Sequence, residues 1–137
     1  MRFFTFSVAV VCASLSLGAI EARAQNWQRN IGSYALKSGE SVEISNLYLV
    51  VNCQSQLVGP VEVSILEGPP GVTATAAEAM VVPRAQQCSK PVKGAKLVVS
   101  AGQVEDTSNT LMTLRVRYPT KDGVREQSLN FMMQLFP

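Results

Sequence analysis

The side chains that most often carry out catalysis are scarce in this chain. It contains no histidine, so neither a Ser–His nor a Cys–His nucleophile pair can form. Ser89 and Lys90 are adjacent, and adjacent side chains of a strand point to opposite faces, so they cannot form a Ser–Lys dyad. Zinc would require Cys/His clusters that are missing. We therefore predict a protein that is not an enzyme and that holds no cofactor and no metal.

One acidic loop and one group of lysines have alternative interpretations. Glu105, Asp106 and Asn109 offer oxygen ligands of the kind that calcium prefers, but their spacing matches no calcium loop, which favours a solvated loop with a local Asx turn. Three lysines recur around Pro91, namely Lys90, Lys93 and Lys96. They form either a cationic patch for an anionic glycan or acidic partner, or they keep an exposed strand edge soluble and unpaired.

Residues 1–24 have the pattern of a secretory signal peptide. A short positive start is followed by an apolar run that reaches Ile20, and Ala22-Arg23-Ala24 places small residues where signal peptidase cleaves. An uncleaved membrane anchor is the alternative, since the apolar run could just span a bilayer. The cleavage site favours removal, which predicts a mature domain of residues 25–137 with no membrane span, in the periplasm or outside the cell.

The mature chain has little net charge and two cysteines. Five Lys and five Arg stand against seven Glu and two Asp, a net charge of +1, which is too small to indicate nucleic-acid or polybasic membrane binding. Cys53 and Cys88 would reach an oxidising compartment, where a disulfide between them is the default.

Short apolar runs separated by turn residues predict an all-β domain. No segment of the mature chain sustains a helical period, and about seven strands are expected. The tryptophan-containing segment 25–32 reads as a polar lead-in to a first strand at 33–36. A long second strand at 41–53 changes its apolar parity, which indicates a bulge at Ser45-Asn46. Further strands are expected at 61–65, at 72–75 and 80–82 on an edge, and at 96–101.

Two runs near the C-terminus predict a hairpin with a defined register. Apolar residues alternate with polar ones over 112–118 and 129–135, on either side of a turn at 120–123. A four-residue loop pairs Pro119 with Val124. The pairs that follow are Leu114 with Leu129 and Met112 with Phe131 on one face, and Arg117 with Glu126 on the other.

The same register groups four residues on the outward face of the hairpin. They are Thr113, Arg115, Asn130 and Met132. Arg and Met are enriched at protein interfaces, which makes this face the predicted binding surface; the alternative is a solvated face. Apolar residues on outward parities, which would mark an interface if they were contiguous, are Tyr48, Val50, Leu66, Val98 and Met132.

The middle of the chain resembles bacterial extracellular or periplasmic immunoglobulin-like modules. The resemblance lies in Gly68-Pro69-Pro70-Gly71-Val72, then Val81-Val82-Pro83, then Leu97-Val98-Val99-Ser100-Ala101, over about 35 residues. It implies an immunoglobulin-like antiparallel β-sandwich, with a partly open barrel as the alternative. In that strand order the second strand ends at the pole where the fifth begins, so Cys53 can meet Cys88 there.

Such modules serve many functions, and three remain open here. We expect a non-catalytic exported binding or accessory module that acts through a sheet face or edge strand on an unknown protein or envelope partner. The alternatives are a structural envelope protein, and a small inhibitor that inserts the loop 67–72 into an extracellular hydrolase. The rigid Pro-Pro turn of that loop would lower the ordering cost of binding.

Overall fold

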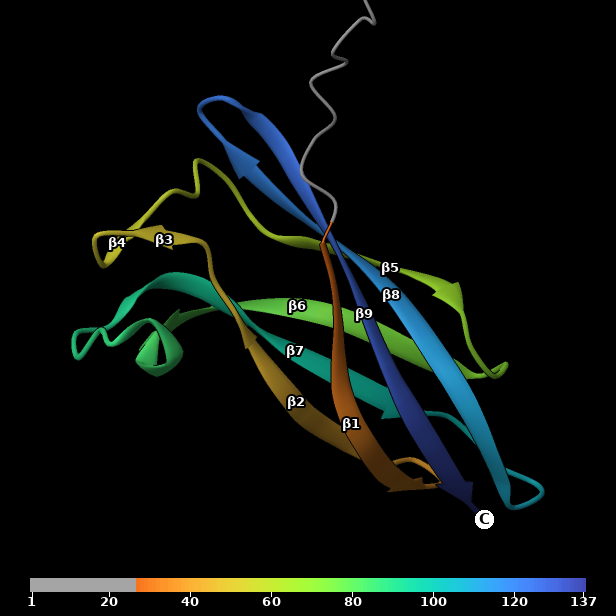
Figure 1. Cartoon of the computed structure of the whole chain (residues 1–137). Coiled ribbons are helices and arrows are strands. Elements are labelled where there is room, and N and C mark those ends of the chain that lie inside the picture. Colours follow the sequence, from red (N-terminus) through yellow and green to blue (C-terminus); the bar gives the residue numbers. More distant parts are fainter. Residues whose placement is uncertain (1–26) are drawn as a thin grey trace, which may run out of the picture.

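The computed structural model describes residues 27–137, which form an all-β structure of two facing sheets (Figure 1). One sheet has the strand order β1-β9-β8-β5, the other β2-β7-β6, and β3 and β4 form a separate hairpin. The strands are β1 (Trp27–Lys37), β2 (Ser41–Leu47), β3 (Val50–Val51), β4 (Gln54–Ser55), β5 (Glu62–Glu67), β6 (Val72–Val81), β7 (Val92–Ala101), β8 (Ser108–Thr120) and β9 (Gly123–Phe136), with one 3-10 helix, η1 (Arg84–Gln86), between β6 and β7.

The core lies between the two sheets, an arrangement consistent with a β-sandwich. Alternate residues of the central strands β7, β8 and β9 are buried, as the period-two pattern requires. Leu97, Met112 and Leu114 are completely inaccessible to solvent. No α-helix occurs in residues 27–137, and this part of the chain therefore has no helix long and apolar enough to cross a membrane. The predicted signal peptide, 1–24, lies outside the described residues.

The predicted hairpin register is confirmed in the pairing of β8 with β9. Pro119 pairs with Val124, Leu114 with Leu129, Met112 with Phe131 and Arg117 with Glu126. The turn is tighter than expected, because Thr120 also pairs with Gly123 and the loop is reduced to two residues. Gly123 has φ of 116°, which favours glycine at this position.

The expectation of purely antiparallel sheets is wrong, because β1 pairs with β9 in parallel (Figure 1). A parallel pair needs a long connection, and here most of the domain lies between the two strands. The segment expected to be a lead-in is part of this strand: β1 starts at Trp27. Backbone pairing with β9 holds these polar residues in an extended strand.

The other predicted strands are correct in place but differ in extent. The register shift of β2 lies between Glu43 and Ser45, one residue before the predicted bulge, and the strand ends at Leu47. The two edge segments expected at 72–75 and 80–82 are one continuous strand, β6. Seven strands have six residues or more. The two-residue strand β3 lies within the predicted second strand, separated from β2, and the two-residue strand β4 was not predicted.

Candidate functional site

The four residues predicted to bind lie together on the outer face of β8 and β9. Thr113 pairs directly with Asn130, while Arg115 pairs with Ser128 and Met132 with Leu111. All four are partly exposed, and the residues that alternate with them in both strands are buried in the core. The sequence therefore placed this surface correctly, and its role in binding stays a prediction.

The charges on this outer face are engaged with one another. Nη2 of Arg117 lies 3.1 Å from Oε1 of Glu126, and Nε of Arg115 lies 3.7 Å from Oε2 of the same carboxylate. The Arg117–Glu126 pair was predicted, but the sharing of Glu126 with Arg115, a diagonal neighbour, was not. A partner on this face would have to compete with these ion pairs.

The outward apolar residues do not form one patch. Val50 lies in the β3–β4 hairpin and Met132 in β9, so they share no sheet. Leu66 is exposed, whereas the other four predicted residues are only partly exposed. Among the large hydrophobic residues of 27–137, the most exposed are Val58 at 63% and Met80 at 62%, and neither was predicted.

The lysines and the acidic loop lie in different surroundings. Lys96 is on the central strand β7 and lies 3.6 Å from Glu43 of β2, so it does not protect a sheet edge. Lys93 is exposed at the start of β7, and Lys90 is exposed in the segment before it. The acidic loop residues are exposed before and at the start of β8, and residues 27–137 contain no group of three or more His, Cys, Asp or Glu that could hold a metal ion.

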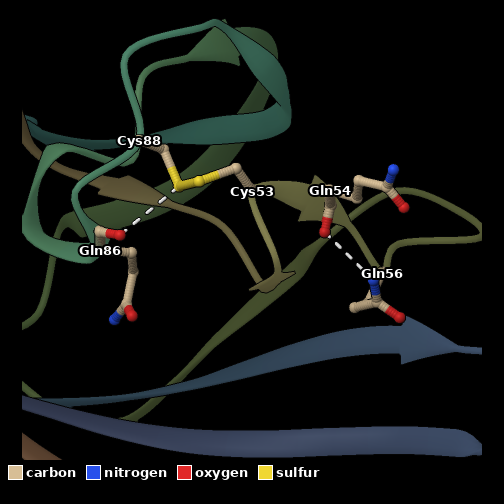
Figure 2. Close-up of a disulfide and its surroundings, with 5 residues drawn as sticks. All are labelled: Cys53, Gln54, Gln56, Gln86 and Cys88. Carbon is tan, nitrogen blue, oxygen red and sulfur yellow. Dashed lines mark hydrogen bonds between the residues drawn. A yellow bond between two sulfur atoms is a disulfide. The ribbon is translucent and has the colours of Figure 1, made fainter.

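The two cysteines lie where the β3–β4 hairpin meets the segment after η1. Cys53 and Cys88 form a disulfide with their Cα atoms 5.5 Å apart (Figure 2). Asn52 and Cys53 are the two turn residues of the hairpin, with φ of 51° and 59°, which is the pattern of a type I′ turn. A cysteine replaces the glycine that such turns favour, so the disulfide rather than turn preference explains this residue.

Sequence reasoning missed a cleft at the end of the molecule where the disulfide lies. Its lining includes Trp27, Arg29, Tyr48, Tyr118 and Gln127, which come from β1, from the segment after β2, and from β8 and β9. The rings of Trp27 and Tyr118 stack with centroids 5.8 Å apart at 16°. The signal available in the sequence was the alternation Trp27, Arg29, Ile31, which is the period of a strand.

Tyr118 lines this cleft with its ring buried and its hydroxyl hydrogen-bonded. It is 2% exposed, and its hydroxyl donates a hydrogen bond to Oε1 of Gln127 at 2.7 Å. Burial raises the pKa of Tyr118 well above its usual range, although the positive charge of Arg29 acts in the opposite direction. The neutral phenol is thus part of the folded structure.

We expect Tyr118 to make the protein sensitive to alkali. An unfolded tyrosine ionises near pH 10, so above that pH the unfolded chain binds fewer protons than the folded one. The stabilisation from Tyr118 is therefore complete below about pH 10 and declines as the pH rises further. Tyr118→Phe should remove this decline, and it should cost about 1–3 kcal/mol at neutral pH because Gln127 loses a buried donor. Urea unfolding of both proteins at pH 7 and above pH 10 tests this; equal pH dependence would contradict it.

The four edge strands differ in how well their open edges are protected. Edges attract additional strands, and proteins block them with bulges and charges. The ladders of β1, β2 and β5 each contain a register shift. The edge strand β6 pairs with β7 over ten residues without any shift, and Glu78 is its one charged residue. Its unblocked edge makes β6 the best candidate for strand addition.

A groove lies beside the inward face of β6. It measures about 460 Å³ and runs between β6 and β5, lined by Val63, Ala74 and Ala76 with Glu62 and Arg117 also in its lining. The small alanines leave space between the sheets that larger side chains would fill. An added strand could therefore pair with the edge of β6 and place alternate side chains in this groove.

Comparisons with known proteins assign this chain to no family. No family model, no curated protein and no solved structure matches it.

Proposed function

We propose that this protein is an exported, non-catalytic binding module with an immunoglobulin-like fold. It acts in the periplasm or outside the cell and recognises an extended segment of a partner protein by strand addition at β6. The signal-like pattern of residues 1–24 and the Cys53–Cys88 disulfide support the compartment. The absence of histidine from the whole sequence supports a role in binding rather than catalysis.

The open edge of β6 is the observation that carries this proposal. Within residues 27–137, the backbone hydrogen bonds outside the strand ladders involve no residue of 72–81, and no side-chain bond reaches this strand. Backbone N–H and C=O groups on this edge are thus available to a strand that a partner protein supplies. Main-chain hydrogen bonds of this kind give affinity without a large side-chain surface. The partner segment should carry apolar side chains at alternate positions, because Val63, Ala74 and Ala76 form the apolar part of the groove beside β6.

Charged residues on the edge of β6 should prevent capture of the partner. Thr73→Lys with Thr75→Lys places two lysines on exposed positions of the edge, which is a device that proteins use against strand pairing. Val98→Lys is the matched control, since Val98 pairs with Thr75 on the same face but lies in the central strand β7. We expect the double variant to recover at least tenfold less partner from an envelope extract, and the control to recover it fully.

Hydrogen exchange of the complex separates strand addition from other modes of binding. Amides of β6 should gain protection when the partner is bound. Full recovery by the double variant together with unchanged exchange in β6 would overturn the proposal. Loss of capture in Arg115→Glu with Met132→Glu alone would place the interface on the outer face of β8 and β9. A hydrolase as the captured partner would favour the inhibitor alternative, and recovery of bulk envelope without a stoichiometric partner would favour the structural one.

A further inference from the structure

The cleft at the disulfide end is continuous with a second hollow. The two measure about 350 Å³ and 590 Å³ and share the lining residues Arg29, Ser45, Asn46, Tyr48 and Ala85. Both volumes lie in the range of small-molecule sites, roughly 300–1,000 Å³. This end cleft is separate from the groove between β5 and β6, which shares no lining residue with it.

Arg29 points into this cleft from the inward face of β1. It pairs in register with Leu129, a core residue that is 1% exposed, and its neighbour at the same parity, Trp27, stacks on Tyr118. A guanidinium on the inward face of a strand is tolerated here because Arg29 remains exposed. The fold therefore directs the guanidinium toward the cleft, where it keeps its contact with solvent.

The cleft has a positive lining. Arg29, Arg84 and Lys96 contribute three positive charges, and Glu43 contributes one negative charge that lies 3.6 Å from Lys96. Within residues 27–137, none of the ion pairs involves Arg29 or Arg84. A guanidinium recognises a carboxylate with two parallel hydrogen bonds, so these residues favour an anionic ligand.

Aromatic rings and neutral hydrogen-bonding groups surround the same positive charge. Trp27 is partly exposed, and its ring is held in place by the stack on Tyr118. Ser45, Asn46 and Gln86 supply neutral donors and acceptors around the pocket. A saturated sugar ring with an apolar C–H face, several hydroxyl groups and one carboxylate would satisfy all three kinds of group.

The disulfide fixes two walls of the cleft relative to each other. One wall is the segment Tyr48 to Val50, which leads into the hairpin that carries Cys53, and the other contains Ala85 and Gln86. Figure 2 shows Gln86 next to the disulfide between Cys53 and Cys88. A bond between the ends of the two segments preorganises the pocket, which lowers the ordering cost of binding.

We infer that this end cleft binds an acidic saccharide: the carboxylate pairs with Arg29, and a sugar ring lies against Trp27. The site is independent of β6, so it goes beyond the proposed protein partner and can be tested without it.

The single tryptophan of the chain gives a direct readout of the cleft. The exported protein with its disulfide intact is titrated with tri-galacturonate while the fluorescence of Trp27 is followed, and neutral maltotriose is the matched ligand. We expect saturable binding of tri-galacturonate, at least tenfold weaker binding of maltotriose, and weaker binding of the acid at higher salt.

Two charge variants test the role assigned to Arg29. Arg29→Gln should weaken tri-galacturonate binding at least tenfold, and Arg29→Lys should fall between, because lysine keeps the charge but loses the bidentate geometry. Lys37→Gln, which removes a positive charge from the far end of the same strand, should bind as the wild type does. Arg29 is exposed, so both of its variants should fold, which circular dichroism checks.

Three results would overturn the inference. Equal affinity for maltotriose would show that the carboxylate is not recognised. Equal response to inorganic phosphate at the same concentration would show a general anion site rather than a saccharide site. Unchanged binding by Arg29→Gln would remove Arg29 from the site. None of these outcomes bears on capture of a protein partner at β6, so failure here leaves the proposed function standing.

Discussion

Replacing Cys53 and Cys88 together by serine should lower the free energy of unfolding by roughly 4 kcal/mol. The disulfide closes a loop with a sequence separation of 35, and the chain-entropy model relates such a loop to about this loss. A small domain is stable by only about 5–15 kcal/mol, so much of the total would disappear. Urea unfolding of the wild type and the double variant measures the difference, and an unchanged midpoint would contradict it.

Two controls show whether the effect belongs to the disulfide. Reduction of the wild type should lower its stability to that of the double variant, because both then lack the same cross-link. Peptide mapping without reductant should find Cys53 linked to Cys88 and no free thiol at either position. The double variant should also bind the acidic saccharide more weakly, since the disulfide joins the two walls of the cleft.

Phe131→Ala should cost about 3–5 kcal/mol, the usual range for removing a large aromatic side chain from a core. Phe131 is 1% exposed in the middle of β9, and it contacts Tyr34 of β1 edge-to-face with ring centroids 5.8 Å apart. Its loss would leave a cavity between Met112, its partner in β8, and the facing sheet.

Phe136 is the matched control for this substitution. It lies five residues later in the same strand but is 37% exposed, so Phe136→Ala removes the same side chain from a surface position. We expect a loss of about 1 kcal/mol or less. Urea unfolding of the two variants should show the contrast, and equal losses would mean that the core is not centred on Phe131.

The sequence predicted the β8–β9 hairpin well because the information there is local. Apolar residues alternate with polar ones on both sides of a short turn, and a one-residue slip would move every core residue to the outside. The alternation therefore determined the pairs Leu114–Leu129 and Met112–Phe131, and with them the shared outer face of Thr113, Asn130 and Met132.

The end cleft could not be predicted, because it joins the segment expected to be a lead-in to residues that lie far from it in the sequence. Arg29 lies in a segment whose strand character depends on pairing with β9, about a hundred residues later. Its inward direction follows from the register with Leu129. Tyr48 reaches the same cleft from the segment after β2, and Gln86 reaches it from the 3-10 helix η1. No short-range pattern connects these positions.

What the sequence by itself determined was the all-β class, the alternation of buried and exposed positions, the hairpin register and the pairing of the two available cysteines. The strand features follow from period-two alternation and short turns, which are visible in residue type and spacing. The disulfide follows from the presence of two cysteines in the predicted mature chain. Tertiary structure alone decided the parallel pairing of β1 with β9, the continuity of β6 as an open edge, and the cleft around Arg29. The physical reason is that alternation specifies only which face of a strand is buried. The strand that pairs with it, the direction of that pairing and the clefts at the ends of the sheets depend on contacts between segments that are distant in the sequence.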